Sequence, residues 1–141
     1  MLSPYLIAIV VAWIVAQGGK LLIASIRQRG KMDLRQLYLS GDMPSAHTAA
    51  VVALVTVIGL AQGTKSSAFA IAALFAAIVM YDAVMVRRST GEQGVAIESL
   101  IRERKSDVKV PRAAKGHEPL EVVAGACVGL LVGVLIYFVT Q

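Results

Sequence analysis

The chain contains only two histidines, and each stands close to the start of an apolar run. His47 lies in SGDMPSAHTAAVV (residues 40–52), and His117 lies in KGHEPLEVVAGACVG (residues 115–129). One imidazole can attack phosphorus as a nucleophile, while another protonates the leaving alkoxide and then deprotonates water. Histidines accompanied by cations therefore suit phosphoryl transfer, because cations neutralise the oxygens of the transferring group.

Several charged residues stand in or beside apolar runs, where a charge is costly and often functional. Lys20 and Arg27 are seven residues apart and so share a helical face, although both could instead extend to the lipid headgroups. Asp82 lies in VMYDAVMVRR, just before Arg87 and Arg88. Asp82 could form a structural pair with Lys20 or with an arginine. It could also ligate magnesium, but one carboxylate gives little support for a metal.

The residues next to the histidines allow both a structural and a chemical interpretation. Glu121 is four residues after His117, so on a helix its carboxylate could hold the imidazole in one tautomer. Alternatively, Glu121 and Pro119 are simply favourable residues for a first helical turn. Ser45 could cap a helix, and the N–H groups of that same helix start could bind phosphate.

The composition indicates which elements hold these residues. The chain of 141 residues is 57% hydrophobic and 16% charged, whereas soluble domains carry about 25% charge. Each of four apolar segments approaches or exceeds the roughly 17–25 residues that span a bilayer. They run from Pro4 to Ile26, Ala46 to Ala61, Ser67 to Val86 and Leu120 to Val139. We therefore expect an all-α integral membrane bundle of four transmembrane helices, forming one domain over residues 1–141.

The basic residues are concentrated in the first and third loops, while the turn between the second and third segments holds only Lys65. The positive-inside rule then places both basic loops in the cytoplasm and both termini outside. We expect the membrane to be the plasma membrane. Both histidines and most of the charged candidates fall at the cytoplasmic end. Within the third loop, EQGVAIESLIRERK (residues 92–105) predicts an amphipathic helix on the membrane surface, or a substrate lid. Nothing in the pattern favours nucleic-acid binding.

Three short segments carry a family resemblance: KLLIASIR (residues 20–27), PSAH (residues 44–47) and HEPLE (residues 117–121). They resemble the three-part signature of the type 2 phosphatidic acid phosphatase superfamily. Nearly the whole chain is similar to a divergent branch of that superfamily, whose small membrane proteins are related to acid phosphatase and vanadium-dependent haloperoxidase.

The resemblance implies a role for each matching position. His117 would be the nucleophile, with Glu121 in the place of the orienting carboxylate, and His47 would be the general acid and base. The residues expected to bind phosphate are Ser45, with nearby backbone N–H groups, Lys20 and Arg27. No cofactor is implied, magnesium stays possible, and nothing in the chain suggests bound vanadate.

The chain also departs from the parent signature. Ala46 replaces a glycine, Gln28 a proline and Glu121 an aspartate, and Pro111 occupies the position of the arginine of the third motif. The missing charge could come from Arg112, Lys115, Arg87 or Arg88. The parent fold commonly has six membrane helices, so a bundle of four could leave the site open or need a second copy, giving a homodimer.

These observations favour a membrane phosphatase acting on a lipid phosphate at the cytoplasmic face. Phosphatidylglycerol phosphate, phosphatidate and prenyl phosphates or diphosphates are the candidate substrates. The alternatives are a non-catalytic lipid-phosphate binder or carrier on the same scaffold, and a purely structural membrane protein.

Overall fold

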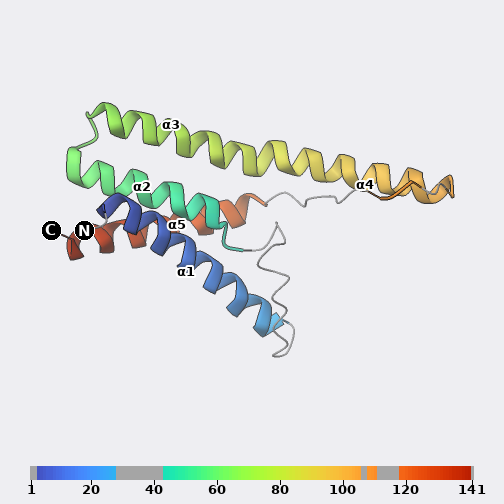
Figure 1. The fold of residues 1–141 in the computed structure, drawn as a ribbon, viewed down its shortest axis with the longest axis horizontal. Helices are drawn as coiled ribbons and strands as arrows, with labels where there is room; N and C mark the ends of the chain where they lie inside the picture. The colour runs from blue at the N-terminus through green and yellow to red at the C-terminus, as the bar shows by residue number, and fades with distance from the viewer. Residues whose placement is uncertain (1–2, 28–42, 106–107, 111–117, 141) are drawn as a thin grey trace.

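The protein is a bundle of helices (Figure 1). The computed structural model describes residues 3–27, 43–105, 108–110 and 118–140, and this part of the chain contains no strand. The helices are α1 (Pro4–Arg27), α2 (Ala46–Gln62), α3 (Ser67–Tyr81), the π-helix η2 (Asp82–Val86), α4 (Arg87–Glu103) and α5 (Pro119–Val139). The predicted all-α class is confirmed, and the expected apolar segments match α1, α2, α3 with η2, and α5 to within one residue.

The lengths and surfaces of the helices are those of a membrane protein. Within the described residues, three helical stretches are long and apolar enough to cross a bilayer: Pro4–Ile26, Ser67–Glu103 and Pro119–Val139. The shorter apolar helix α2 has 17 residues, which at 1.5 Å per residue gives about 25 Å, near the lower limit for a span. Large apolar side chains remain exposed on the outside of the bundle, as expected for contact with lipid. On α3 these are Ile71, Leu74, Phe75, Ile78 and Tyr81.

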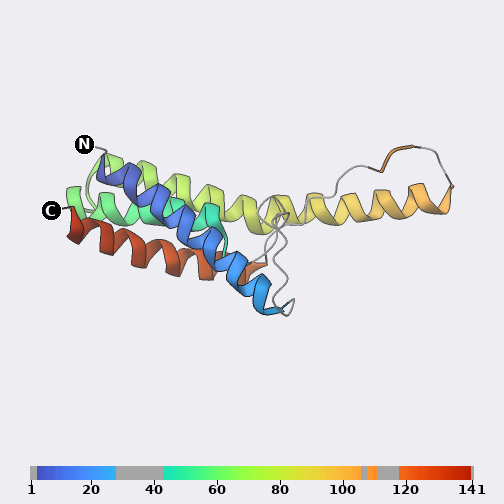
Figure 2. The same ribbon diagram turned by 60° about the horizontal axis from the view of Figure 1, so that its bottom comes forward.

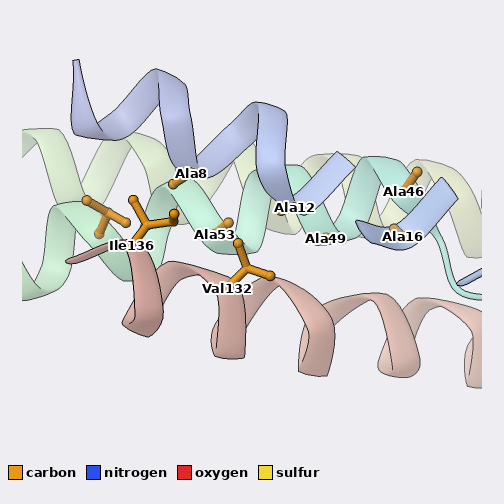
Figure 3. Packing of buried hydrophobic residues seen from close by; sticks show 9 residues of the cluster. Ala8, Ala12, Ala16, Ala46, Ala49, Ala53, Val132 and Ile136 are labelled. Atoms are coloured by element: carbon orange, nitrogen blue, oxygen red, sulfur yellow. The ribbon is translucent and has the colours of Figure 1, made fainter. Parts of the chain in front are cut away.

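Helix α2 is the centre of the bundle and contacts α1, α3 and α5. The core between α1, α2 and α5 consists mainly of alanines, with Val132 and Ile136 from α5 (Figure 3). The alanines are Ala8, Ala12 and Ala16 from α1, and Ala46, Ala49 and Ala53 from α2. Small side chains let the helix backbones approach closely, which is how membrane helices gain packing energy where lipid removes most of the hydrophobic driving force.

Helix α5 packs on α2 through three glycines spaced four residues apart. A Cβ added at Gly125 would lie 2.5 Å from the carbonyl oxygen of Ser45, and one at Gly133 would lie 2.7 Å from Cβ of Thr56. At Gly129 the added atom would meet the carbonyl oxygen of Ala49. Only glycine fits at such a close approach, so this stripe fixes the register of α5 against α2.

Helices α3, η2 and α4 form one continuous rod, and α4 projects beyond the rest of the bundle (Figures 1 and 2). The rod has 37 residues, which corresponds to about 55 Å, against a hydrocarbon core of about 30 Å. The expected amphipathic segment is helical, as predicted. The segment is not a separate surface helix, because α4 continues α3 through η2. No proline interrupts the chain between Ser67 and Glu103.

The end of the bundle that holds the α2–α3 turn is closed by local polar contacts. Gly63 ends α2 with φ of +80°, a value that favours glycine, and Ser66 caps α3 by accepting a hydrogen bond from the N–H of Phe69. The side-chain amide of Gln62 donates a bond of 2.9 Å to the hydroxyl of Tyr5, joining α2 to the first turns of α1. Both chain termini lie at this end (Figures 1 and 2).

Candidate functional site

The opposite end of the bundle brings the second and third motif segments together. The backbone N–H of Ser45, just before α2, donates a hydrogen bond of 3.0 Å to the carbonyl oxygen of Glu121 in the first turn of α5. This bond joins residues 76 positions apart in the sequence. The close contact of Gly125 with Ser45 one turn further along α5 holds the same junction. Two helix starts are therefore fixed side by side, and both present N–H groups and partial positive charge.

Ser45 is the N-cap of α2, as its position before the apolar run predicted. Its Oγ accepts hydrogen bonds from the N–H of Thr48 at 3.4 Å and from Oγ1 of Thr48 at 3.0 Å. Ser45 is fully buried, with 0% exposure, and Thr48 is equally buried. The hydroxyl of Ser45 therefore serves the start of α2. A phosphate at this helix would bind the backbone N–H groups of the first turn more readily than that hydroxyl.

His47 is the second residue of α2 and is exposed, in contrast to its buried neighbours Ala46 and Thr48. The cap at Ser45 sets where α2 begins, and so sets the direction in which His47 leaves the helix. His47 thus lies beside the junction with α5, two residues after the N–H of Ser45 that bonds Glu121.

Lys20 brings the first motif segment to the same end of the bundle. It follows Ala8, Ala12 and Ala16 at the helical spacing of four, so it continues the face of α1 that packs in the core. Lys20 is buried, with 8% exposure, which disfavours the alternative that it extends along the outside of the bundle to the headgroups. The adjacent Gly19 lies against the ring of Pro44, because an added Cβ would be 3.4 Å from Cδ of Pro44.

Helix α1 carries two more polar residues near this end, Arg27 and Gln17. Arg27 is the last residue of α1, about two turns beyond Lys20. Gln17 was not among the predicted site residues, since a neutral amide in an apolar segment gives no strong signal. Its Oε1 is buried and has no hydrogen-bond partner in the described part of the chain. A buried unsatisfied acceptor is unusual and marks Gln17 as a further polar group one turn before Lys20.

Glu121 contributes its carboxylate to the start of α5. The N–H of Glu118 donates a hydrogen bond of 3.1 Å to Oε2 of Glu121, and the N–H of Glu121 donates one of 2.9 Å to the carbonyl oxygen of Glu118. The first bond is the one that the Glu121 side chain contributes to a capping box, and the second is a backbone bond of the first turn, in which Pro119 is the first residue. The predicted helix start is confirmed.

Asp82 pairs with an arginine, one of the partners expected for it. Oδ2 of Asp82 accepts a hydrogen bond of 2.6 Å from Nε of Arg87, and the two residues stand at the two ends of η2. Arg88 instead pairs with Glu92 of α4, at 3.2 Å between Nε and Oε1. Helix η2 also contacts α5, so the Asp82–Arg87 pair is close to the end of the bundle where α5 begins.

The remaining predicted site residues, His117 and Lys115, lie outside the described residues, as do Arg112 and Pro111. Within the described ranges, no three His, Cys, Asp or Glu side chains are grouped closely enough to hold a metal ion. The structure thus brings Lys20, the PSAH segment and Glu121 to one end of the bundle. Asp82 of η2 and its partner Arg87, the first residue of α4, lie toward the same end.

The fold and these polar residues define a small helical membrane protein with motif segments from separate helices gathered at one end. The chain belongs to the Divergent PAP2 family, whose model matches residues 1–132. It is 40% identical to the uncharacterized membrane protein YuiD of Bacillus subtilis (strain 168), over 94% of each chain. No solved structure matches the chain significantly. The predicted resemblance to a divergent branch of the type 2 phosphatidic acid phosphatase superfamily is confirmed.

Proposed function

We propose that the protein is a membrane phosphatase that hydrolyses a lipid phosphate at the cytoplasmic face through a phosphohistidine intermediate. The observation that carries the proposal is the hydrogen bond from the N–H of Ser45 to the carbonyl oxygen of Glu121. This bond ties the PSAH segment, which holds His47, to the start of α5, which follows His117 in the sequence. The substrate class is phosphatidylglycerol phosphate, phosphatidate or a prenyl phosphate or diphosphate.

The proposed reaction has two steps. The imidazole of His117 attacks phosphorus, the bond from phosphorus to the lipid oxygen breaks, and His47 gives its proton to the leaving alkoxide. His47 then takes a proton from water, whose oxygen attacks the phosphohistidine and releases inorganic phosphate. Glu121 would hold His117 in the tautomer that attacks, and Lys20 and Arg27 would neutralise the phosphate oxygens.

The location of the polar residues supports a lipid substrate. Lys20 is buried on a membrane helix, and large apolar side chains are exposed around the bundle. A lipid phosphate can bring its headgroup to this end of the bundle while its tails stay in the bilayer, whereas a soluble phosphate ester gains nothing from such an environment.

The proposal is tested by phosphate release from the purified full-length chain in detergent, with each of the three lipid classes and with either magnesium or EDTA. We expect turnover of at least one class in EDTA as well as in magnesium, because no metal is needed for the proposed steps. His117→Ala should reduce release to the uncatalysed background. Arg102→Ala is the matched control, because Arg102 lies near the C-terminal end of α4, and it should leave turnover unchanged.

Trapping of the intermediate separates the enzyme from a non-catalytic binder. With a lipid labelled in its phosphate, wild type quenched in alkaline SDS should retain label on protein, because the P–N bond of phosphohistidine is stable in base and labile in acid. His47→Ala should retain part of the label because the nucleophile is intact. Lipid binding without release of phosphate would favour the binder or carrier. Equal turnover by wild type and His117→Ala would reject the proposed nucleophile.

A further inference from the structure

The π-helix η2 makes possible an ion pair that a regular helix would not allow. The backbone N–H of Arg87 donates to the carbonyl oxygen of Asp82, and its side-chain Nε donates to Oδ2 of Asp82 at 2.6 Å. Both bonds span five residues. In an α-helix, residues five apart lie about 140° apart around the axis, so their side chains would leave on different faces. The wider π-turn returns Arg87 to the side of Asp82.

Arg87 lies between two buried residues of the rod formed by α3, η2 and α4, and its own side chain is 50% exposed. Ala83, four residues earlier, is buried, and so is Gly91, four residues later. Residues at this spacing share a helix face. Ala83 belongs to η2, the part of the rod that contacts α5. Arg88 is one position further around the helix and is held along α4 by Glu92.

We infer that Arg87 supplies the cation that the third motif lacks, and that Asp82 is the residue that positions it; this inference rests on the proposed function. A guanidinium has five N–H donors. The bond to Asp82 uses the one on Nε, and the other four belong to the Nη atoms, the edge that binds phosphate in a bidentate manner. The arginine thus comes from the third span of this chain, whereas the parent signature has its arginine ahead of the histidine of the third motif.

The placement explains why Asp82 is tolerated near a phosphate site. A carboxylate beside a phosphate would repel it, unless the carboxylate is already paired with a cation. At 2.6 Å from Nε, Asp82 is paired in this way and fixes the orientation of the guanidinium plane. Asp82 is therefore a positioning residue, acting on the phosphate only through Arg87.

The test measures binding as well as turnover in the purified full-length chain. The probes are inorganic phosphate and a phosphonate analogue of dioctanoyl phosphatidate, whose carbon–phosphorus bond is not hydrolysed. We expect Arg87→Ala to weaken phosphonate binding about tenfold or more, since a charge-assisted contact is lost. Arg87→Lys should fall between wild type and Arg87→Ala, because it keeps the charge but not the fork of donors.

A double mutant isolates the role of Asp82. Asp82→Asn should weaken binding by about threefold to tenfold in the wild-type background, and should have no further effect when combined with Arg87→Ala. The matched controls are Arg102→Ala and Glu98→Gln, which break a similar ion pair further along α4 and should leave binding within about twofold. Helix content and elution volume in detergent report whether each variant folds.

The possible outcomes separate this inference from the proposed function. If Asp82→Asn and Arg87→Ala lower thermal stability but leave phosphonate binding unchanged, the pair is structural and the inference is wrong. A larger loss from Arg88→Ala than from Arg87→Ala also overturns it. If wild type binds neither probe, the proposed function and the inference both fall. If wild type binds the phosphonate but hydrolyses no lipid, only the catalytic proposal fails, and the affinities of the variants still decide the role of Arg87.

Discussion

Gly125 of α5 lies so close to α2 that a methyl group added to it would be 2.5 Å from the carbonyl oxygen of Ser45. The contact occurs one turn after Glu121, whose own carbonyl oxygen accepts the N–H of Ser45. The same glycine stripe that packs the two helices therefore also sets the distance between two of the motif segments.

Gly125→Ala should destabilise the bundle by about 1–3 kcal/mol, because backbone on the facing helix cannot move aside as a flexible side chain would. The measurement is the thermal unfolding midpoint in detergent. The control is Gly18→Ala on α1, where an added Cβ meets nothing within 4 Å. That variant should be neutral or more stable by up to about 1 kcal/mol, because alanine is the better helix former. Equal effects of the two substitutions would contradict the packing described for α5.

Ser45→Ala should cost about 1–2 kcal/mol of stability, because it removes the cap of α2 and leaves two buried donors of Thr48 without their acceptor. Ser66→Ala removes the cap of α3 at the other end of the bundle, where the serine is less buried. It should cost less, about 0.5–1 kcal/mol. Unfolding in detergent measures both changes.

The two serine variants also locate the site. Ser45→Ala should lower lipid-phosphate turnover beyond its effect on the folded fraction, since the start of α2 would loosen beside His47. Ser66→Ala should leave turnover per folded molecule unchanged. A loss of turnover in Ser66→Ala equal to that in Ser45→Ala would place the site elsewhere.

Much of the fold follows from hydropathy alone. The apolar segment predicted from Ala46 to Ala61 is α2, and that from Leu120 to Val139 is α5 with Pro119 added at its start. Boundaries were predictable where a cap or a proline marks them. The continuity of α4 with α3 was not recognised, because the sharp change from apolar to charged residues at Arg87 resembles the end of a helix. A change of polarity marks the membrane surface, whereas a helix ends only where its backbone bonds end.

The candidate site was predictable in its residue types and depth, and less so in its contacts. Counting residues along the spans predicted that Lys20 and Ser45 lie at one end of the bundle. An arginine was among the partners expected for Asp82, but Arg87 in particular was not, because a spacing of five residues predicts no contact in an α-helix and nothing in VMYDAVMVRR signals a π-turn. The role of Glu121 in the capping box was predictable from its place three residues after the N-cap position.

The orientation in the membrane can be tested with single cysteines. The one native cysteine, Cys127, is exposed on α5, so the background variant is Cys127→Ala. Lys65→Cys, in the turn between α2 and α3, should react with a membrane-impermeant maleimide on intact cells. Arg104→Cys, at the end of α4, should react only after the membrane is permeabilised. The reverse pattern would put the motif segments on the outer face and exclude a cytoplasmic substrate pool.

Glu121 offers the sharpest distinction between a structural and a catalytic carboxylate. Glu121→Gln keeps an oxygen that accepts the N–H of Glu118, so the capping box and the stability of α5 should change little. If Glu121 also orients His117, the amide would favour the wrong tautomer, and kcat should fall by about 100-fold or more. Glu121→Ala should lose both the cap, about 1 kcal/mol, and the turnover. Steady-state turnover and unfolding of the same preparations separate these effects. Wild-type kcat in Glu121→Gln would show that the carboxylate serves the helix start alone, and the nucleophile would then have to be oriented by a different group.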